Sequence, residues 1–451
     1  MEPFRFHLFV CTQQKPEGVQ SCPAAGSFAV LVRLDREIQS QGLEADVQLT
    51  TCGCLGLCDE GPVLVVYPAG VWYRRVQPSD VPEIVATHLA GGKPVERLVW
   101  NDEAAMKAMA VEHRDKFRES MAAREKSGVL PDRLEQTIRG FMPSRVLLTA
   151  LELDVFTAVA DGGDVEHISG KLNASARGTG ILLNALVSLG LLSKSGDRYA
   201  NTPESARFFV QGSKDNHRNG LIHIVNMWNR WSTLTDAVRS GRRVFDREKS
   251  QDWTKDFIAA MQRIARERAP LVVKALGSNG THKLLDLGGG SGAYSIAFAK
   301  VNPAAQCEIL DVPEVVPLTE DYIMKAGVSA QVKLRPGNML CDDFGSGYDL
   351  IMLNAICHMF SEEQNRDIIR RARQALAPGG QLSVQDFILN DDKTAPQQAA
   401  LFSVNMLVGT DAGASYSERE YTRWMTDAGF QEVRRVKLPG PSDLIVGTNR
   451  G

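Results

Sequence analysis

The sequence predicts an α/β protein made of several units, and three observations indicate this fold class. From residue 281 onward, short apolar strands alternate with helical segments, which is typical of a parallel sheet joined by helical crossovers. Between residues 132 and 214, apolar residues recur at helical spacing. Five of the eight cysteines lie in the first 58 residues, which sets the beginning of the chain apart. A chain of 451 residues is long enough for two or three domains.

The first unit, predicted over residues 1–98, carries its cysteines in two separate segments. Cys11 and Cys22 are followed after a long gap by Cys52, Cys54 and Cys58 in the stretch TTCGCLGLCDEGP. Four thiolates gathered from two loops can hold a [2Fe–2S] cluster or a zinc ion. A zinc site usually has closely paired cysteines, and the first two are too widely spaced for that pattern. Disulfides would suit an exported protein, but MEPFRFHLFVC lacks the features of a signal peptide.

This cysteine spacing resembles that of the thioredoxin-like [2Fe–2S] ferredoxins, whose ligands come from two separate loops. The resemblance extends to FRFHLFVC, which is typical of a first strand, and to residues 61–89, which predict a hairpin followed by a helix. It implies that Cys11, Cys22, Cys54 and Cys58 are the ligands of a [2Fe–2S] cluster and that Cys52 is spare. Zinc, a redox-active disulfide and ordinary buried thiols remain the alternatives.

Residues 99–131 are dense in Ala, Lys, Arg and Glu, which predicts an exposed helical linker. Gly128 and Pro131 are expected to end this helix. Its charges are more typical of a solvated face than of a binding site.

The next unit, residues 132–214, has short amphipathic helices followed by SGDRYANTPESARFF, which predicts a small hairpin and another helix. This winged-helix-like order resembles the N-terminal dimerisation region of the plant and animal small-molecule O-methyltransferases, and it implies a homodimer. The candidate recognition helix ARGTGILLNALVSLG is largely apolar with one arginine, which favours burial against a partner subunit over DNA binding. A net charge of −3 with no basic tract gives no indication of a nucleic-acid partner.

The last unit, residues 215–451, begins with a helical bridge and continues as a Rossmann-like sheet. Its predicted strands are KLLDLG, CEILDV, VKLRPG, YDLIMLN, QLSVQDFIL and a last pair near EVRRVKLP and LIVGTN. In LLDLGGGSGAYS, a strand runs into a turn where Gly288, Gly290 and Gly292 let the backbone approach a ligand at the start of a helix. Asp311 can accept hydrogen bonds from ribose hydroxyls. These features alone fit NAD as well as S-adenosylmethionine.

Two further features favour S-adenosylmethionine. Asp286 precedes the glycines, where class I methyltransferases use a carboxylate to hold the cationic methionine end of the cofactor. The segment RPGNML resembles the motif that clasps adenine in that family, with Asn338 where aspartate is usual, and its amide oxygen can still accept from adenine. Met339 and Asn354 complete the predicted cofactor set. The resemblance to this family covers residues 134–449 in order.

The reaction site is predicted at CHMF, directly after strand YDLIMLN. This region resembles the caffeic acid and acetylserotonin O-methyltransferases, in which a histidine deprotonates the acceptor hydroxyl and a carboxylate orients the histidine. The resemblance implies that His358 is the base and Asp386 the orienting group. Met359 and Phe360 replace the family's Asp and Trp, and Ser415 replaces a second acid, so the charged support is thinner. A core histidine that caps the following helix is the alternative.

Acceptor contacts are expected from three helical segments, and aromatic and methionine side chains there predict a flat aromatic acceptor. At these spacings such residues are also typical of plain core. Cys357 is expected to be an inert buried thiol. The predicted acceptor residues are His223, Met227, Trp228, Trp231, Phe257, Met261, Met406 and Thr410.

The function that combines these features is S-adenosylmethionine-dependent methylation of a hydroxyl on an aromatic or quinol-like small molecule. One hypothesis for the cluster is reduction of a quinone-like acceptor to the hydroquinone that is then methylated, with an electron donor as partner. The alternatives are a redox enzyme on a methyltransferase scaffold and a non-catalytic redox sensor that binds the cofactor. No apolar run approaches the roughly 20 residues that span a bilayer, so we expect a cytoplasmic protein without a membrane partner.

Overall fold

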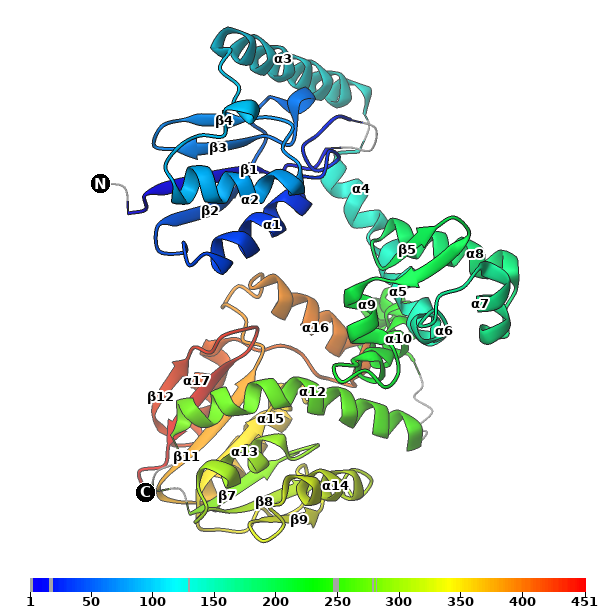
Figure 1. The fold of residues 1–451 in the computed structure, drawn as a ribbon. Helices are drawn as coiled ribbons and strands as arrows, with labels where there is room; N and C mark the ends of the chain where they lie inside the picture. Colours follow the sequence, from blue (N-terminus) through cyan, green and yellow to red (C-terminus); the bar gives the residue numbers. More distant parts are fainter. Residues whose placement is uncertain (1–2, 16–18, 129, 246–250, 278–279, 281) are drawn as a thin grey trace. The chain divides into compact units, whose positions relative to one another are not determined.

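The computed structural model describes residues 3–15, 19–128, 130–245, 251–277, 280 and 282–451. The chain divides into two compact units, Met1–Arg139 and Gly140–Gly451 (Figure 1). In these described ranges, no helix is both long enough and apolar enough to cross a bilayer.

The N-terminal unit is built on a four-stranded sheet in the order β2-β1-β3-β4. The predicted first strand is β1 (Phe6–Cys11), and the predicted hairpin is β3 (Leu64–Tyr67) with β4 (Val71–Tyr73), so both are confirmed. A helix over 81–90 follows the hairpin as predicted, with α2 (Val81–Glu83) continuing as the π-helical η3 (Ile84–Ala90). The structure also contains two elements that were not predicted: the helix α1 (Ser27–Ser40) and the strand β2 (Val47–Cys52), which pairs parallel with β1.

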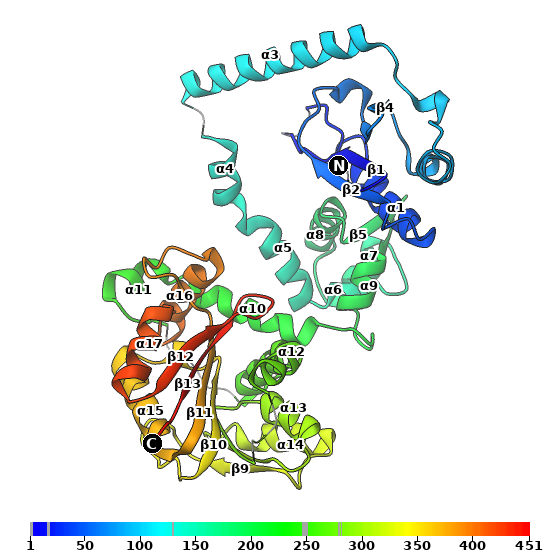
Figure 2. The same cartoon turned by 90° about the vertical axis from the view of Figure 1, so that its left-hand side faces the viewer.

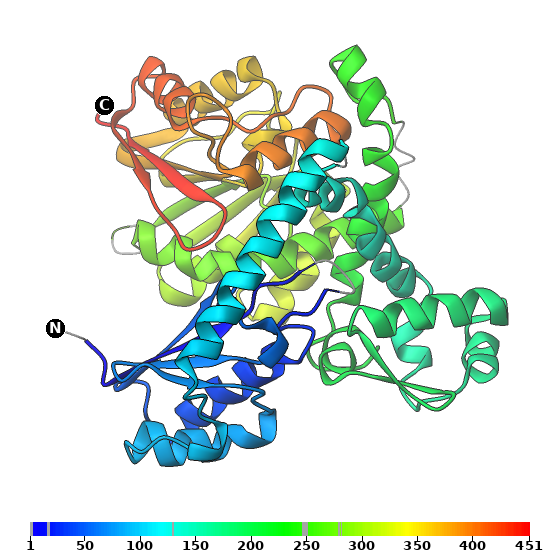
Figure 3. The same cartoon turned by 90° about the horizontal axis from the view of Figure 1, so that it is seen from above.

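The predicted linker helix is α3 (Glu103–Ser127), a single long helix in all views (Figure 2, Figure 3). Asp102 caps its start by accepting a hydrogen bond from the Ala105 amide at 2.9 Å, and Gly128 ends it in the left-handed region at φ +67°. Most of α3 is exposed, as predicted for a solvated face. It is more than a linker, however, because an apolar stripe packs on the cysteine segments; this stripe comprises Ala105, Met106, Met109 and Ala110.

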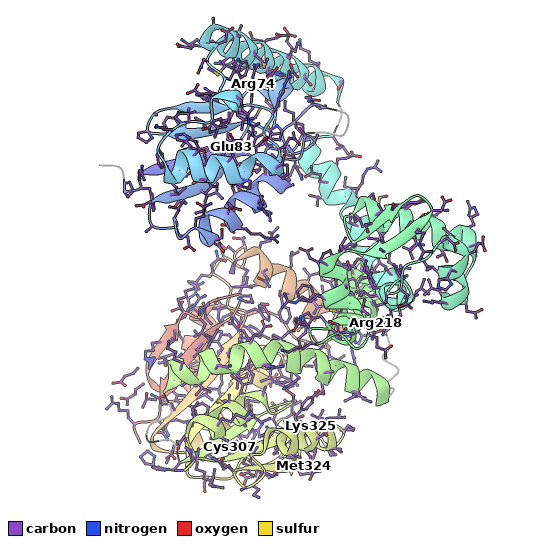
Figure 4. All side chains as sticks on the ribbon, viewed as in Figure 1. Arg74, Glu83, Arg218, Cys307, Met324 and Lys325 are labelled. Carbon is purple, nitrogen blue, oxygen red and sulfur yellow. The ribbon has the colours of Figure 1, made fainter. Side chains whose placement is uncertain are left out.

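The second unit begins with a helical region that contains a small hairpin, as predicted. The hairpin pairs β5 (Leu192–Ser195) with β6 (Arg198–Asn201) in a two-stranded sheet. Arg218, labelled in Figure 4, connects the next helix to this region by donating to the Leu151 carbonyl at 2.9 Å. The helix α4 (Asp132–Arg139) is the last element of the N-terminal unit. The helices of this part of the second unit are α5 (Phe141–Glu152), α6 (Val155–Ala158), α7 (Val165–Leu172), α8 (Ala176–Ser188) and α9 (Pro203–Phe209).

A seven-stranded sheet forms the rest of the second unit, in the order β12-β13-β11-β10-β7-β8-β9. The five neighbouring strands β11, β10, β7, β8 and β9 run parallel to one another. The strand β13 runs antiparallel to both of its neighbours, β11 and β12. Each strand predicted from the sequence is present. The strands are β7 (Lys283–Leu287), β8 (Gln306–Asp311), β9 (Val332–Pro336), β10 (Tyr348–Asn354), β11 (Leu376–Asp386), β12 (Gln431–Val436) and β13 (Asp443–Thr448).

Helices cover both faces of this sheet (Figure 2), so the inner parallel strands β7 and β10 are buried on two sides. One face packs against α12 (Gln251–Leu276), α13 (Ala293–Val301) and α14 (Val316–Ala326). Cys307 of β8 (Figure 4) lies in that core. The other face packs against α15 (Glu362–Ala375) and α17 (Glu418–Asp427). The remaining helices are α10 (Arg218–Trp231), α11 (Leu234–Ser240) and α16 (Gln397–Gly409).

Candidate active site

The turn between β7 and α13 requires glycine at two positions. Gly288 has φ +67°, and a Cβ there would lie 2.7 Å from Met339 Cε and 3.0 Å from Ile356 Cγ1. Gly292 has φ +74°, and a Cβ there would lie 3.0 Å from Ile309 Cδ1. Left-handed backbone angles and close packing both exclude larger residues. The turn is therefore held tightly at the carboxyl end of the central strand.

A cavity of about 930 Å³ opens at this turn, beyond the carboxyl ends of β7, β8 and β9. This edge of an open α/β sheet is where ligands bind, at the point where the strand order reverses. Five of the predicted cofactor residues line it: Gly288, Gly290, Asp311, Asn338 and Met339. Phe257, which was predicted to touch the acceptor, also lines this cavity, as do Met359 and Phe360.

Asp311, the last residue of β8, lies at the cavity wall. Its Oδ2 accepts a hydrogen bond from the Gly290 amide at 2.8 Å, and its Oδ1 accepts one from the Val312 amide at 2.7 Å. Burial raises the pKa of Asp311, and these two hydrogen bonds oppose the rise. Each carboxylate oxygen keeps a lone pair that two ribose hydroxyls can use.

Asp286 does not line the cavity but lies fully buried just behind the glycine turn. Its Oδ2 accepts a hydrogen bond from Ser295 at 2.8 Å, whereas no partner for its Oδ1 is found in the described part of the chain. Burial raises the pKa of Asp286 to about 6, and the charge of Asp311 adds to this. The neighbouring Asn354 amide is also buried without a well-formed hydrogen bond among the described residues. The Asp286 carboxylate and the Asn354 side-chain amide therefore lie side by side, and both can still form hydrogen bonds to a ligand.

Asn338, which was predicted to contact adenine, lines the cavity. Its side-chain oxygen already accepts a hydrogen bond from the backbone amide of Leu340 at 2.9 Å, and its backbone amide donates to Asp342 Oδ2 at 2.7 Å. The asparagine therefore shapes the turn after β9, and its oxygen has one remaining lone pair for a ligand.

His358 and Asp386 form a buried pair, as predicted. His358 Nδ1 lies 2.7 Å from Asp386 Oδ1, and the His358 amide donates to Asp386 Oδ2 at 3.0 Å. The side chains are 8% and 2% exposed. With the proton placed on Nδ1, Nε2 carries the lone pair that a general base needs. Ala355, at φ +52°, makes the turn that leads from β10 into this short helix, η5 (Cys357–Met359).

Two phenylalanines beside His358 were not predicted. Phe402 of α16 meets the imidazole edge-on, with ring centroids 4.7 Å apart and an interplanar angle of 88°. Phe387, the residue after Asp386, stacks on Phe402 at 4.1 Å and 26°. The signal available in the sequence was weak: Phe387 adjoins a predicted residue, and Phe402 lies one turn before Met406. Together they form an aromatic wall next to the imidazole.

The predicted acceptor residues divide among different surroundings. Trp231 donates to Asn405 Oδ1 on α16 at 3.0 Å, and His223 packs edge-on against Phe257 at 5.4 Å. Trp228 instead packs against the core of the helical region, with Arg145 5.7 Å from its ring. Met227 lies on α10 and Met261 on α12, and both side chains are partly buried.

Met406 and Thr410 lie close to the backbone at His358. The Thr410 hydroxyl donates to the Met406 carbonyl at 2.7 Å and accepts from the Gly413 amide at 2.9 Å. A Cβ on Gly413 would lie 2.2 Å from the His358 carbonyl oxygen. Glycine is therefore required where this loop passes the backbone of His358 and Met359.

The cysteine segments meet at one end of the N-terminal unit. Cys54 Sγ lies 3.4 Å from Cys58 Sγ, and the Cys11 thiol interacts with those of Cys22 and Cys54. Hydrogen bonds from Cys11 and Cys58 lower the pKa of Cys54 to about 2, whereas the pKa of Cys11 is raised. All eight cysteines are unbridged. Within the described residues, no three Cys, His, Asp or Glu side chains are arranged as a ready metal-ion site, so the four thiols meet only through pairwise contacts.

Comparisons with known proteins assign the second unit. The family profile of the O-methyltransferase domain matches residues 231–431, and that of the O-methyltransferase dimerisation domain matches residues 135–211. A 3-hydroxy-5-methyl-1-naphthoate 3-O-methyltransferase from Streptomyces sahachiroi is 31% identical over 344 residues, which cover 72% of this chain and 99% of that protein. The chain belongs to the O-methyltransferase family.

Mammalian relatives agree with this assignment. The acetylserotonin O-methyltransferase of Bos taurus is 29% identical over 334 residues, covering 69% of this chain and 96% of that protein. The structure of human N-acetylserotonin methyltransferase with S-adenosylmethionine matches with a TM-score of 0.63 at 27% identity, over 70% of this chain and 96% of that one. The protein is thus an S-adenosylmethionine-dependent O-methyltransferase with a dimerisation domain. The profile matches begin at residue 135, so they leave the N-terminal unit without an assignment.

Proposed function

We propose that this methyltransferase methylates a hydroxyl group of an aromatic small molecule, with His358 as the general base. The observation that carries the proposal is the buried His358–Asp386 pair beside the Phe387–Phe402 stack. An imidazole held by a carboxylate suits deprotonation of a phenol near neutral pH. The aromatic wall suits a flat ring, since aromatic pairs prefer stacked or edge-on contacts. The relatives named above for a naphthoate and for acetylserotonin support the same acceptor class.

The residues have distinct parts in the proposed reaction. When bound, S-adenosylmethionine supplies an electrophilic methyl group. The glycine turn admits the cofactor, and Asp311 binds its ribose. Asp286 and Asn354 have unpaired hydrogen-bonding atoms that bind its methionine end. His358 Nε2 takes the proton of the acceptor hydroxyl, and Asp386 stabilises the imidazolium through Nδ1. The apolar Met359 and Phe360 exclude water from the cavity wall.

A labelled-methyl experiment tests this proposal. With S-adenosylmethionine labelled in its methyl group, we expect label in the ether product of phenols and hydroquinones with flat fused or single rings. A matched panel in which the same hydroxyl is already methylated should accept no label. Label on a ring carbon, or equal labelling of the blocked panel, would contradict hydroxyl methylation. Turnover of a pre-reduced acceptor only in the presence of an electron donor would favour a redox enzyme on this scaffold.

We also propose that two chains assemble through the dimerisation region. Several large apolar side chains of this region are exposed in the single chain, including Phe141 at 52% and Ile181 at 58%. The match of residues 135–211 to the dimerisation profile supports this. Light scattering should give twice the mass of one chain.

For the N-terminal unit, we propose a thioredoxin-like fold that holds a [2Fe–2S] cluster through Cys11, Cys22, Cys54 and Cys58. The β2-β1-β3-β4 sheet with a parallel first pair and an antiparallel hairpin supports the fold. The donors suit the cluster, because four soft sulfur ligands come from two loops. Lys15 donates to Cys58 Sγ at 3.0 Å and the Gly56 amide donates to Cys54 Sγ at 3.3 Å, which stabilises thiolates.

The helix α3 adds a wall to this proposed site. Its apolar stripe packs against a cluster that contains Cys11, Cys22 and Trp100, and Arg74 (Figure 4) lies over the Trp100 ring at 5.2 Å. A Cβ on Gly56 would lie 3.2 Å from Ala110, so the cysteine loop and the helix are closely fitted. A [2Fe–2S] cluster supplies single electrons, so reduction of a quinone-like acceptor would need two electrons and two protons, with the electrons from an external donor.

The spare cysteine provides a matched control for the ligand assignment. We expect protein purified without oxygen to carry about two iron atoms per chain and a visible charge-transfer spectrum. Cys22→Ser and Cys58→Ser should each lose the spectrum, because a serine oxygen is a poor ligand for iron in such a cluster. Cys52→Ser should retain it. Equal loss in all three variants, or stoichiometric zinc in place of iron, would contradict the assignment.

A further inference from the structure

We propose that Tyr421 is a positioning residue of the methyltransferase, which acts by holding the carboxylate of Asp386 against His358. This inference rests on the proposed role of His358 as the base. Tyr421 lies on α17, far along the chain from both partners, and its hydroxyl donates to Asp386 Oδ2 at 3.0 Å. Tyr421 is fully buried and Asp386 is 1% exposed.

Asp386 is a buried carboxylate whose only ion-pair partner among the described residues is His358. A buried charge of this kind needs hydrogen-bond donors to offset its lost hydration. Four donors provide this: His358 Nδ1, the amides of His358 and Phe387, and the Tyr421 hydroxyl. Three of them come from Asp386's own neighbour or from His358 itself. Tyr421 is therefore the donor that fixes the carboxylate from an independent element.

Tyr421 matters more in this chain because two acids that the resembling family has near the histidine are replaced here. Ser415 takes the place of a second acid, and the structure places its hydroxyl on the Ala399 carbonyl at 3.0 Å, away from the imidazole. Met359 supplies no polar group either. Among the described residues, Asp386 is therefore the carboxylate that orients His358, and Tyr421 is the donor that holds Asp386 from a separate helix.

The charged and titratable groups around the pair come from three elements. Cys357 of η5 lies beside Tyr421, and burial raises the pKa of each well above its ordinary value. Tyr294 of α13 interacts with the Asp386 charge, and burial raises its pKa as well. The raised pKa values keep Cys357, Tyr421 and Tyr294 neutral at neutral pH, so none of these three side chains adds a charge beside Asp386.

Removing the tyrosine hydroxyl has a defined electrostatic consequence. Without that donor, the negative charge of Asp386 is less compensated, so it stabilises the protonated imidazole more strongly. The base then becomes available only at higher pH. A freer carboxylate also orients the imidazole less well, which lowers the rate of proton transfer.

The test is the pH profile of kcat/KM for Tyr421→Phe in the full-length enzyme. We expect the acid limb of this profile, where activity rises with pH, to move to higher pH by about 0.5–1 pH unit. At the plateau, kcat should fall by about tenfold while the KM for S-adenosylmethionine stays unchanged. The position of the limb does not depend on how much of the preparation is folded. In an Asp386→Asn background, Tyr421→Phe should have little further effect, because the two residues act through one contact.

Tyr416→Phe is the matched control, since it removes one hydroxyl from the same buried aromatic cluster. The rings of Tyr416 and Tyr421 are 6.0 Å apart, but the Tyr416 hydroxyl donates to the Phe360 carbonyl at 2.6 Å and not to Asp386. It should leave the acid limb in place. An unmoved limb in Tyr421→Phe, or an equal shift in both variants, overturns the proposal. Full activity of His358→Ala would instead refute the base assignment on which it rests.

Discussion

Replacing His358 by alanine should lower kcat for a phenolic acceptor by about 10²–10⁴-fold, the usual contribution of a general base. The imidazole is buried, and its Nδ1 is held by Asp386 at 2.7 Å, so no bulk water can take its place without rearrangement. The binding of S-adenosylmethionine should change little, because His358 does not line the cofactor cavity. Steady-state kinetics and calorimetric titration separate the two effects.

Two further observations make this prediction specific. Because alanine leaves a space at His358, added imidazole should restore part of the activity, with a pH dependence that follows free imidazole. A more acidic acceptor should be less affected, since its hydroxyl is already ionised at neutral pH. A loss below tenfold would mean that proximity to the methyl group, and not proton removal, limits the reaction.

The sheet could be predicted from the sequence because each of its strands is marked by the residues of the strand itself. Each is a short apolar segment between helical segments, and burial on two faces removes the need for alternation. The missed α1 carried a readable pattern, since Val30, Leu34 and Ile38 recur at helical spacing and are buried.

The pair of His358 and Asp386 was implied by the family resemblance, and the sheet explains why the two residues meet. Asp386 is the last residue of β11, and His358 lies shortly after the end of β10. The carboxyl ends of adjacent parallel strands meet at one edge of the sheet, so β10 and β11 bring them together. Tyr421 and Phe402 could not be predicted in this way. They come from helices whose distance from the site is set by tertiary packing, and at helical spacing an aromatic residue is typical of plain core. Trp228 illustrates that ambiguity, because it packs in the helical region.

Replacing Asp286 by asparagine should weaken S-adenosylmethionine binding by about 10–100-fold, the usual effect of losing a hydrogen bond to a charged group. The same change should stabilise the cofactor-free protein at neutral pH. Burial raises the pKa of Asp286 from 3.8 to about 6, so the ionised carboxylate destabilises the folded state by about 3 kcal/mol. Opposite effects on binding and stability are characteristic of a residue kept for function.

The pH dependence of this stabilisation has a defined sign. Since its folded-state pKa is raised, Asp286 keeps its proton in the folded chain between pH 3.8 and about 6, while the unfolded chain loses it. The stability of the wild type therefore falls across that interval and stays lower above it. The advantage of Asp286→Asn should be absent below the interval and constant above it, as measured by thermal unfolding at a series of pH values.

Asp349→Asn provides the matched control, because it removes a carboxylate near the amino end of β10, whereas Asp286 lies near the carboxyl end of the neighbouring strand β7. Asp349 Oδ2 accepts hydrogen bonds from the amides of His282 and Lys283, both at 2.8 Å, so this carboxylate has partners and lies at the edge of the sheet opposite the glycine turn. This variant should lose stability and keep its affinity for S-adenosylmethionine, the reverse of Asp286→Asn. If both variants lost stability alike, the buried charge of Asp286 would serve the fold and not the cofactor.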